Sequence, residues 1–273
     1  MDWSGDLRKQ IAISSERYAP EHKLPYYKSL GPFPTIMFEP FQFQGDVRHG
    51  NFLDASYRAI LENPSWVVRL DKKHPKACCL PECKRKQARE LDSSNSSDAL
   101  LMNIFCYPGV LSFELSALFH RSVLPDPEFG TPGCVPLSNG KDDATEIDMR
   151  FGEDIIIEAK LTERDFTSKC KNVVRKYKDF DEIFNEGELG QTETKYHSYQ
   201  LIRNILATYH YKYFFFLLCD KRRCDLQMKY KTVYNAIKCE ALRSRCEVIF
   251  WQDIASVVSS ELKGFLSEKY GIQ

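Results

Sequence analysis

The chain has 273 residues, of which 43% are hydrophobic and 13% aromatic. This composition suffices for a substantial core and excludes a wholly disordered chain. Lysine plus arginine equals aspartate plus glutamate at 38 each, so the net charge does not indicate nucleic-acid binding. A nucleic-acid partner would have to meet a local basic patch.

The sequence lacks the signals of export and membrane insertion. Residues 1–20 do not have the positively charged and then apolar layout of a secretory signal. The longest apolar stretch, residues 211–218, is far shorter than the roughly 18 residues of a membrane span. Ten cysteines at irregular spacing are typical of reduced, mostly buried thiols. We therefore expect a cytoplasmic protein with no membrane partner.

Residues 1–47 are expected to form an N-terminal arm, and residues 48–273 the main domain. Residues 5–18 of the arm predict a helix. The dense prolines that follow resist helix formation and predict an extended segment laid on the domain surface. These prolines are Pro20, Pro25, Pro32, Pro34 and Pro40.

A helix is predicted after Arg48, where apolar residues recur at near-helical spacing until Asn63 and Pro64 end the pattern. His49 precedes this helix. A lone histidine in such a place is more often a hydrogen-bonded structural residue than a catalytic one. We therefore expect His49 to be structural.

Residues 69–90 contain the densest basic run of the chain, which is either a solvated segment or a phosphate-binding one. Four residues within this run could supply zinc ligands, namely His74, Cys78, Cys79 and Cys83. Their spacing matches no standard zinc ribbon or finger, and adjacent cysteines are awkward joint ligands. A zinc-dependent binding module is therefore the weakest functional alternative.

Two helices are predicted after the polar run at residues 92–97. The first carries an apolar face and ends at Pro108, and the second covers residues 111–123. Asn103 lies among apolar neighbours in the first helix, so its amide needs partners and is expected to tie the helix to the sheet.

Residues 145–163 predict a β-hairpin around which the chemistry is organised. The consecutive β-branched residues 155–157 indicate a strand covered on both faces. Glu158 and Lys160 are two residues apart and share one face, while Ala159 points the other way. Asp148 on the partner strand is expected to lie abreast of Glu158. Two carboxylates and one ammonium would then converge at the end of a buried sheet.

This set of groups suits a divalent metal, because carboxylate oxygens are the ligands that Mg²⁺ and Mn²⁺ prefer. Lys160 would orient or deprotonate a water, or offset charge on the phosphate. The alternative is a hairpin with merely solvated charged ends. Glu114 and Glu128 are further acidic candidates, although both are expected to be surface charges.

The remaining elements predict an α/β fold with a mixed sheet. A charged segment at residues 162–196 is expected to be partly helical, either exposed or lining a substrate channel. A helix at 196–209 and a central strand at 213–219 follow. A helix at 230–243, a strand at 246–251 and a helix at 252–269 complete the chain.

Asp148, nine intervening residues and then Glu158-Ala159-Lys160 resemble the core motif of the PD-(D/E)xK, or restriction endonuclease-like, nuclease superfamily. Ile147 replaces the usual proline. The order of the Asn103 helix, the hairpin and the helix with Gln200 is similar to that of a bacterial branch with no settled substrate. The resemblance covers roughly residues 48–255 and includes the sequence RHGNFLDASYRAI at residues 48–60.

The resemblance implies a restriction endonuclease-like core, with a central mixed β-sheet flanked by helices and an N-terminal extension. Asp148 and Glu158, with the carbonyl of Ala159, would bind Mg²⁺ or Mn²⁺, and Lys160 would serve the hydrolytic step. Gln200 falls where RecB-like nucleases have a glutamine near the active site, but Asn204 stands where their tyrosine is expected. The clustered cysteines do not match the iron–sulfur pattern of those nucleases.

We therefore expect a metal-dependent nuclease that hydrolyses phosphodiester bonds, with DNA as its partner, in restriction, defence or repair. The alternative is a catalytically silent nucleic-acid-binding protein on the same fold. The sequence leaves open DNA versus RNA, endonuclease versus exonuclease action, sequence specificity, and whether the chain forms a homodimer.

Overall fold

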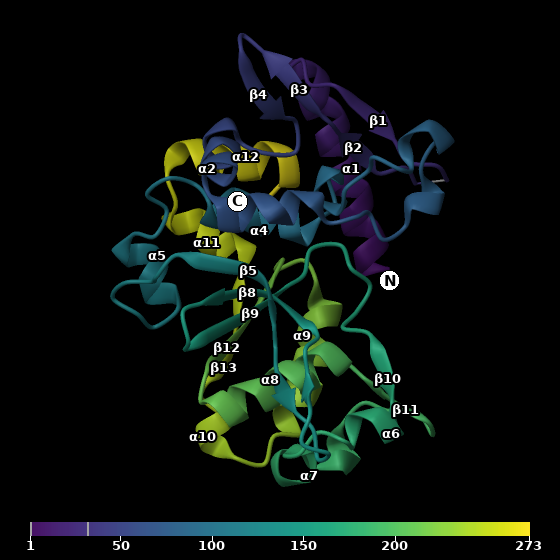
Figure 1. The fold of residues 1–273 in the computed structure, drawn as a ribbon, viewed down its shortest axis with the longest axis vertical. Helices are drawn as coiled ribbons and strands as arrows, with labels where there is room; N and C mark the ends of the chain where they lie inside the picture. The colour runs from purple at the N-terminus through teal and green to yellow at the C-terminus, as the bar shows by residue number, and fades with distance from the viewer. Residues whose placement is uncertain (1, 32) are drawn as a thin grey trace. The chain divides into compact units, whose positions relative to one another are not determined.

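The computed structural model describes residues 2–31 and 33–273, which form two compact units (Figure 1). The first unit contains the chain up to Leu124 together with Trp251–Gln273, and the second is Pro125–Phe250. These divisions differ from the expected boundary at residue 47. Pro32, one of the prolines that predicted the extended arm, lies outside the described residues.

The first unit is mainly helical. Its helices are α1 (Trp3–Glu21), α2 (Asp54–Glu62), α3 (Pro64–Val67), α4 (Ser97–Phe105), α5 (Phe113–Leu118), α11 (Trp251–Val257) and α12 (Ser260–Tyr270). Short 3₁₀ helices lie at Val68–Asp71, Ala77–Cys79, Glu82–Lys84 and Glu90–Asp92. Two antiparallel ribbons complete it, β1 (Tyr26–Lys28) with β2 (Ile36–Phe38), and β3 (Pro40–Phe43) with β4 (Asp46–His49). The expected arm is thus a helix followed by short paired strands.

The two ends of the chain share the core of the first unit. Helices α1 and α12 pack side by side, and the rings of Tyr18 and Phe265 meet edge to face at 6.1 Å. Lys269 of α12 donates through Nζ to the carbonyl of Gly50 at 3.2 Å. The N-terminal residues therefore belong to a core that the C-terminal helices complete, which explains why the boundary is not at residue 47.

Asn103 holds α4 against the segment that precedes α2. Its side-chain oxygen accepts from the N–H of Leu53 at 2.7 Å, and its amide nitrogen donates to Asn51 O at 3.0 Å and Ala99 O at 2.7 Å. The expectation that a buried Asn103 would find partners is confirmed. The partners outside its own helix, Asn51 and Leu53, lie in the segment before α2, whereas we expected them in a sheet.

Several predicted helices are shorter than expected. The helix predicted at 111–123 is α5, and the helix at 252–269 is divided into α11 and α12 where Ser259 caps the second. The helix predicted at 230–243 is divided into α9 (Cys224–Asn235) and α10 (Glu240–Arg243). Between these two, backbone groups of residues 236–238 bond to residues 183–185 instead of continuing the helix. Tertiary hydrogen bonds thus override the local pattern.

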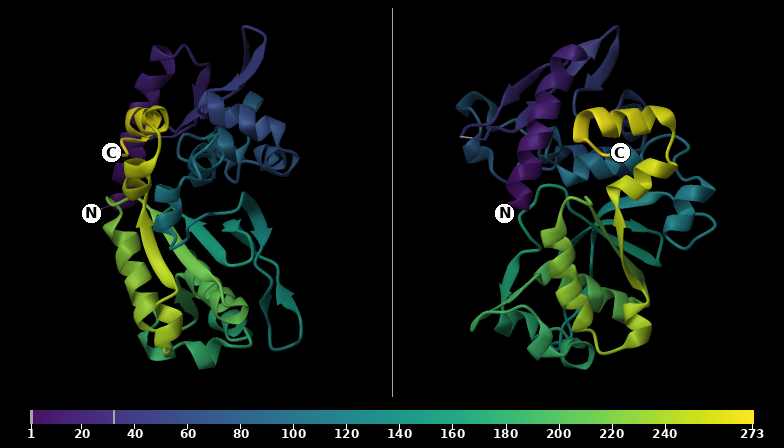
Figure 2. Two further views of the ribbon diagram at one scale, coloured as in Figure 1. Left: turned by 90° about the vertical axis from the view of Figure 1, so that its left-hand side faces the viewer. Right: turned by 180° about the vertical axis from the view of Figure 1, so that it is seen from behind.

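The second unit is built on a five-stranded mixed sheet of order β13-β12-β9-β8-β5 (Figures 1 and 2). The strands are β5 (Pro127–Pro132), β8 (Glu146–Phe151), β9 (Ile155–Ala159), β12 (Phe214–Cys219) and β13 (Cys246–Phe250). β5, β8 and β9 are antiparallel, and β9, β12 and β13 are parallel. The predicted hairpin and the apolar strand are confirmed as neighbours in one sheet.

Helix α8 (Tyr199–Tyr211) covers one face of this sheet by packing on β9 and β12. Its apolar stripe includes Ile202 and Ile205, which belong to one buried cluster with Ile156 and Leu217 of the sheet. The long apolar face that the sequence predicts for this helix is therefore the face that meets the sheet.

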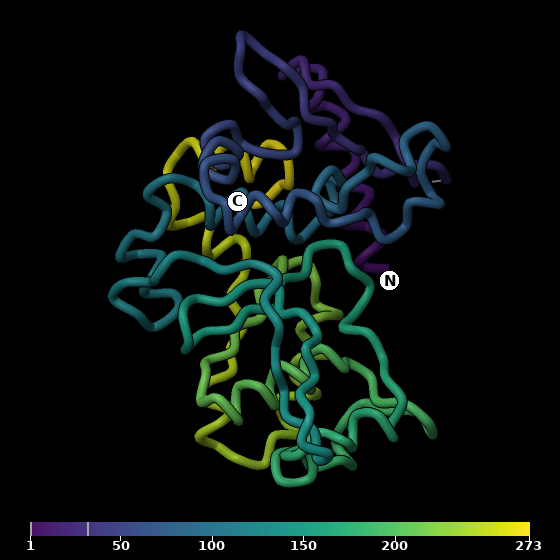
Figure 3. The backbone as a smooth tube through the Cα atoms, in the orientation of Figure 1, coloured from purple at the N-terminus to yellow at the C-terminus, as the bar shows by residue number. Residues whose placement is uncertain are grey.

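Residues 162–196 do not form an exposed helix. The backbone runs from β9 through this segment before it enters α8 (Figure 3). The segment contains β10 (Ser168–Cys170), which pairs with β11 (Lys195–His197), as well as α6 (Lys171–Val174), α7 (Phe180–Ile183) and a 3₁₀ turn at Glu186–Glu188. A small ribbon of β6 (Val135–Pro136) and β7 (Asp142–Asp143) completes the unit. Among the described residues, no helix is long and apolar enough to cross a membrane.

Candidate functional site

The candidate site begins where β8 and β9 stop pairing. Their ladder runs from Phe151 opposite Ile155 to Met149 opposite Ile157. At the next position a side chain replaces the backbone as hydrogen-bond acceptor. Asp148 Oδ2 accepts from the N–H of Ala159 at 2.9 Å. The ladder therefore ends with a carboxylate fixed beside the last peptide of β9.

Glu158 is the centre of the site and is fully buried, with 0% of its surface exposed. Its Oε1 lies 2.7 Å from the ammonium of Lys160 and accepts from Gln200 Nε2 at 2.7 Å. Its Oε2 accepts from Asn204 Nδ2 at 2.8 Å. The structure thus brings Glu158 into contact with Lys160 and Gln200, both named from the sequence, and with Asn204.

Lys160 is also buried, and its charge depends on the carboxylates around it. Burial alone lowers its pKa, but the charges of Glu158, Asp148 and Glu163 and the hydrogen bond with Glu158 raise that pKa above the ordinary value. In the metal-free protein the side chain is therefore an ammonium at neutral pH, which donates hydrogen bonds. This favours an orienting or charge-offsetting role.

Arg203 and Asn204 form a support behind Glu158 that the sequence analysis missed. Arg203 donates to Asn204 Oδ1 from Nε at 3.0 Å and from Nη2 at 2.9 Å, and Nη2 also reaches the carbonyl of Glu146 at 3.0 Å. Because Arg203 holds the oxygen of this amide, the nitrogen faces Glu158. The available signal was the spacing of Gln200 and Asn204, which are four residues apart and share a helix face.

We expect Asn204→Leu to lower the free energy of unfolding by roughly 1–3 kcal/mol, because Glu158 loses a donor and Arg203 loses an acceptor inside the protein. Urea denaturation monitored by circular dichroism measures this. Thr208→Val on the same buried face is the matched control, since it removes only an intrahelical bond to the carbonyl of Asn204. Equal stabilities of the two variants would contradict a supporting role for Asn204.

The donor set suits Mg²⁺ or Mn²⁺ better than zinc. Mg²⁺ typically uses one or two protein carboxylates and retains several waters, and Asp148 and Glu158 supply two carboxylates beside Ala159. Among residues 2–31 and 33–273, no group of three or more His, Cys, Asp or Glu side chains could hold a metal ion. A binding site would therefore depend on the two carboxylates and on oxygen from the Ala159 carbonyl and water.

The other acidic candidates have different surroundings. Glu128 of β5 pairs with Arg150 Nη2 at 2.8 Å on the exposed side of the sheet. Glu114 is exposed in the first turn of α5 in the first unit. Both are surface charges, as expected, and neither contacts the Glu158 carboxylate.

Part of the basic run at residues 69–90 is neutralised within the first unit. Arg69 and Lys72 both contact Asp98 Oδ2, at 2.7 and 2.8 Å, and Lys84 pairs with Glu39 at 2.6 Å. These pairs favour a structural role over phosphate binding for Arg69, Lys72 and Lys84. The zinc alternative in the same run has no geometric support, because the three cysteines are exposed and form no metal-ligand group with His74 among the described residues.

A family model described as restriction endonuclease associating with ARP matches residues 14–271. No curated protein and no solved structure matches the chain. The match covers nearly the whole chain and includes both compact units.

Proposed function

The chain belongs to the family of restriction endonucleases associating with ARP, and from this premise we propose that it is a divalent-metal-dependent nuclease that hydrolyses phosphodiester bonds of DNA. The observation that carries the proposal is the buried contact between Glu158 and Lys160 beside Asp148. An acid, a second acid and an ammonium lie together where two strands of the central sheet separate.

In this proposal, Asp148, Glu158 and the carbonyl of Ala159 would hold one Mg²⁺ or Mn²⁺. A bound ion would supply polarisation of a phosphate oxygen and a lowered pKa of a water molecule. Gln200 and Asn204 fix the two oxygens of Glu158 in advance, which spares the reorganisation of that carboxylate during the reaction.

Lys160 supplies positive charge and hydrogen bonds to the reacting phosphate or the attacking water. The charges of Glu158, Asp148 and Glu163 raise the pKa of Lys160 in the metal-free protein, which supports an electrostatic contribution. Arg203 acts through Asn204 and through its own charge, since its Nη2 lies 3.9 Å from Glu158 Oε2, and it is a positioning residue in the proposal. The surrounding β9, β12 and α8 exclude bulk water from Glu158, which strengthens these electrostatic effects.

The proposal is tested by incubating the purified chain with linear, circular and single-stranded DNA and with RNA, in Mg²⁺, Mn²⁺ or EDTA. We expect DNA cleavage with either metal, no cleavage in EDTA, and recovery when metal is added in excess. Cleavage of circular DNA would identify an endonuclease. Gel electrophoresis of labelled substrates measures the products.

DNA binding without cleavage under every metal condition would support the silent nucleic-acid-binding alternative and contradict the nuclease. A role in restriction, defence or repair and a cytoplasmic location remain part of the proposal. The homodimer stays a prediction that sedimentation of the purified protein tests.

A further inference from the structure

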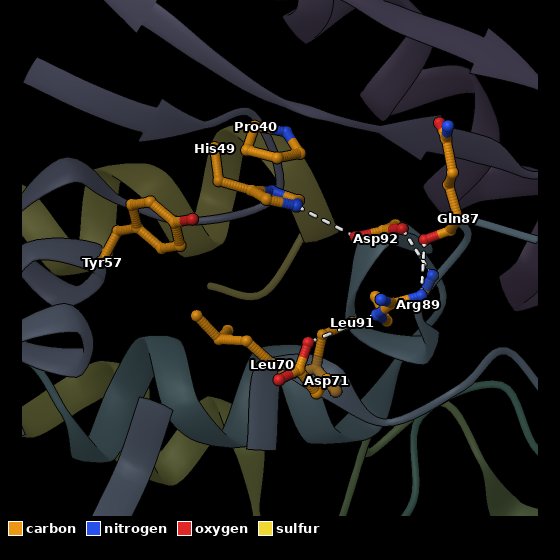
Figure 4. A pocket seen from close by; sticks show the side chains of 9 residues that line it. All are labelled: Pro40, His49, Tyr57, Leu70, Asp71, Gln87, Arg89, Leu91 and Asp92. Carbon is orange, nitrogen blue, oxygen red and sulfur yellow. Dashed lines mark hydrogen bonds and ion pairs between the residues drawn. The ribbon is translucent and has the colours of Figure 1, made fainter. Parts of the chain in front are cut away.

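The first unit contains a cavity of about 250 Å³ that the proposed reaction does not use (Figure 4). It lies between the start of β3 and the segment 70–92. Its apolar walls include Leu70, Leu91 and the ring of Tyr57, and its polar groups include Arg89 and Asp92. The cavity is smaller than the roughly 300–1,000 Å³ of pockets for drug-sized ligands. A small ring system is therefore the size of ligand that suits it.

The side chains of His49 and Asp92 in this cavity form hydrogen bonds with each other and with the backbone. His49 Nδ1 accepts from the N–H of Asn51 at 3.1 Å, so the neutral ring carries its proton on Nε2, which lies 3.1 Å from Asp92 Oδ1. Asp92 Oδ2 accepts from the backbone N–H of Arg89 at 2.6 Å. Burial, opposed by Asp92, lowers the pKa of His49. Both ring nitrogens are thus hydrogen-bonded within the protein, as expected of a structural histidine.

Tyr57 brings to the cavity a hydroxyl that has no protein partner. Its residue is 5% exposed, and its hydroxyl forms no hydrogen bond with any residue that the structure describes. Figure 4 shows this hydroxyl directed into the hollow between His49 and Leu70. The hydroxyl is open to the cavity and has no protein partner to give up, so it is suited to a ligand that supplies a donor or an acceptor.

The outer edge of the cavity carries a cation. The Arg89 side chain is 34% exposed, and its Nη1 donates to the carbonyl of Gln87 at 2.8 Å. Asp71 faces Arg89 Nε at 3.5 Å, but its side chain is 85% exposed, so this pair is weak. A guanidinium has five N–H donors in a planar fork that matches phosphate, which leaves Arg89 able to bind an anion at the mouth.

We propose that this cavity binds one unstacked nucleobase, with its ring between the Tyr57 and leucine side chains and its phosphate against Arg89. The base supplies polar edge atoms to the Tyr57 hydroxyl and flat faces to the apolar walls. The base belongs either to a strand of nucleic acid or to a free nucleoside monophosphate. The strand source rests on the proposed function, since it requires nucleic acid as the partner.

The test uses the full chain in EDTA, so that cleavage does not contribute. The probes are 2-aminopurine nucleoside 5′-monophosphate and an oligonucleotide with one internal 2-aminopurine, both followed by fluorescence. We expect saturable binding of the monophosphate with one site per chain. An increase in oligonucleotide fluorescence that the monophosphate competes away assigns the site to a base in a strand, and monophosphate binding without that increase assigns it to a free nucleotide.

Tyr57→Phe removes only the hydroxyl and is expected to weaken monophosphate binding about tenfold. Its melting temperature should equal or exceed that of the wild type, because the hydroxyl has no protein partner to lose. Tyr26→Phe on strand β1, away from the cavity, is the matched control and should leave binding unchanged. A structural role for the Tyr57 hydroxyl would instead lower the melting temperature.

Two variants at the mouth separate phosphate from base. Arg89→Gln should weaken the monophosphate but not the corresponding nucleoside, and Asp71→Asn should strengthen the monophosphate by removing a competing carboxylate. The inference is overturned if neither probe binds the wild type, or if Tyr57→Phe binds the monophosphate as tightly as the wild type. Because no cleavage is measured, base binding in this cavity would stand even if the chain proved not to be a nuclease. Failure of base binding would likewise leave the nuclease proposal intact.

Discussion

Replacing Glu158 by alanine is expected to abolish metal-dependent cleavage and to lower the free energy of unfolding by about 3–5 kcal/mol. The loss of activity follows from the loss of a metal ligand. The loss of stability follows because Lys160 remains buried, 7% exposed in its side chain, without the carboxylate that lies 2.7 Å from its ammonium. Cleavage assays and urea denaturation measure the two effects.

A double variant separates the two effects of Glu158. Glu158→Gln combined with Lys160→Met removes the buried Glu158–Lys160 pair, and replacing a buried ion pair by neutral groups is often close to neutral for stability. Arg203 stays buried in this variant but keeps Asn204 Oδ1 and the carbonyl of Glu146 as acceptors. We expect this variant to unfold near the wild-type urea concentration and to cleave no DNA. Asp148→Ala changes the second proposed metal ligand, which is partly exposed. Mg²⁺ should raise the free energy of unfolding of the wild type, because it binds the folded state, but should not raise that of this variant. Wild-type cleavage by the double variant would refute the assignment of this site.

Replacing Lys160 alone by methionine is expected to slow cleavage by about a hundredfold or more, the usual effect of one positioned electrostatic group. The same change should strengthen Mg²⁺ binding, because the ammonium no longer competes for Glu158 Oε1. Single-turnover cleavage and calorimetric Mg²⁺ titration give the two values. Slower cleavage together with tighter Mg²⁺ binding distinguishes a role in the reaction from general misfolding. Misfolding would slow cleavage and also weaken Mg²⁺ binding.

Lys169→Met is the control for this variant. Lys169 is an exposed lysine of β10 that lies over the ring of Tyr199, so its loss removes a positive charge near α8 without touching Glu158. We expect it to leave Mg²⁺ affinity unchanged. Cleavage by Lys160→Met at the wild-type rate would contradict the proposed role of Lys160 in the reaction.

The sequence determined the elements whose patterns are local. The consecutive isoleucines 155–157 and the turn at residues 151–154 specify the hairpin, because side-chain alternation and turn formation depend on neighbouring residues. The apolar stripe of the helix that became α8 has the period of 3.6 residues that any sheet-covering helix needs. The spacing of Asp148, Glu158 and Lys160 placed three groups at one strand end for the same reason.

Only the tertiary structure decided which groups complete that site. Asn204 reaches Glu158 from 46 positions away in the chain, because the register of α8 on the sheet sets the contact. In the sequence, Asn204 stands out only as a departure from a family pattern. The burial of Lys160 and Glu158 as one ion pair likewise depends on what covers the strand end, and it changes the stability expected of every variant there.

The division into units was also a tertiary result. Local patterns predicted a proline-rich arm, but they did not indicate that α1 would pack on α12 from the opposite end of the chain. The partnerless hydroxyl of Tyr57 has the same origin, since its helix was predicted while the cavity depends on distant residues 70–92. Periodicity reports which face of an element is apolar, and long-range packing alone decides what that face and its polar neighbours meet.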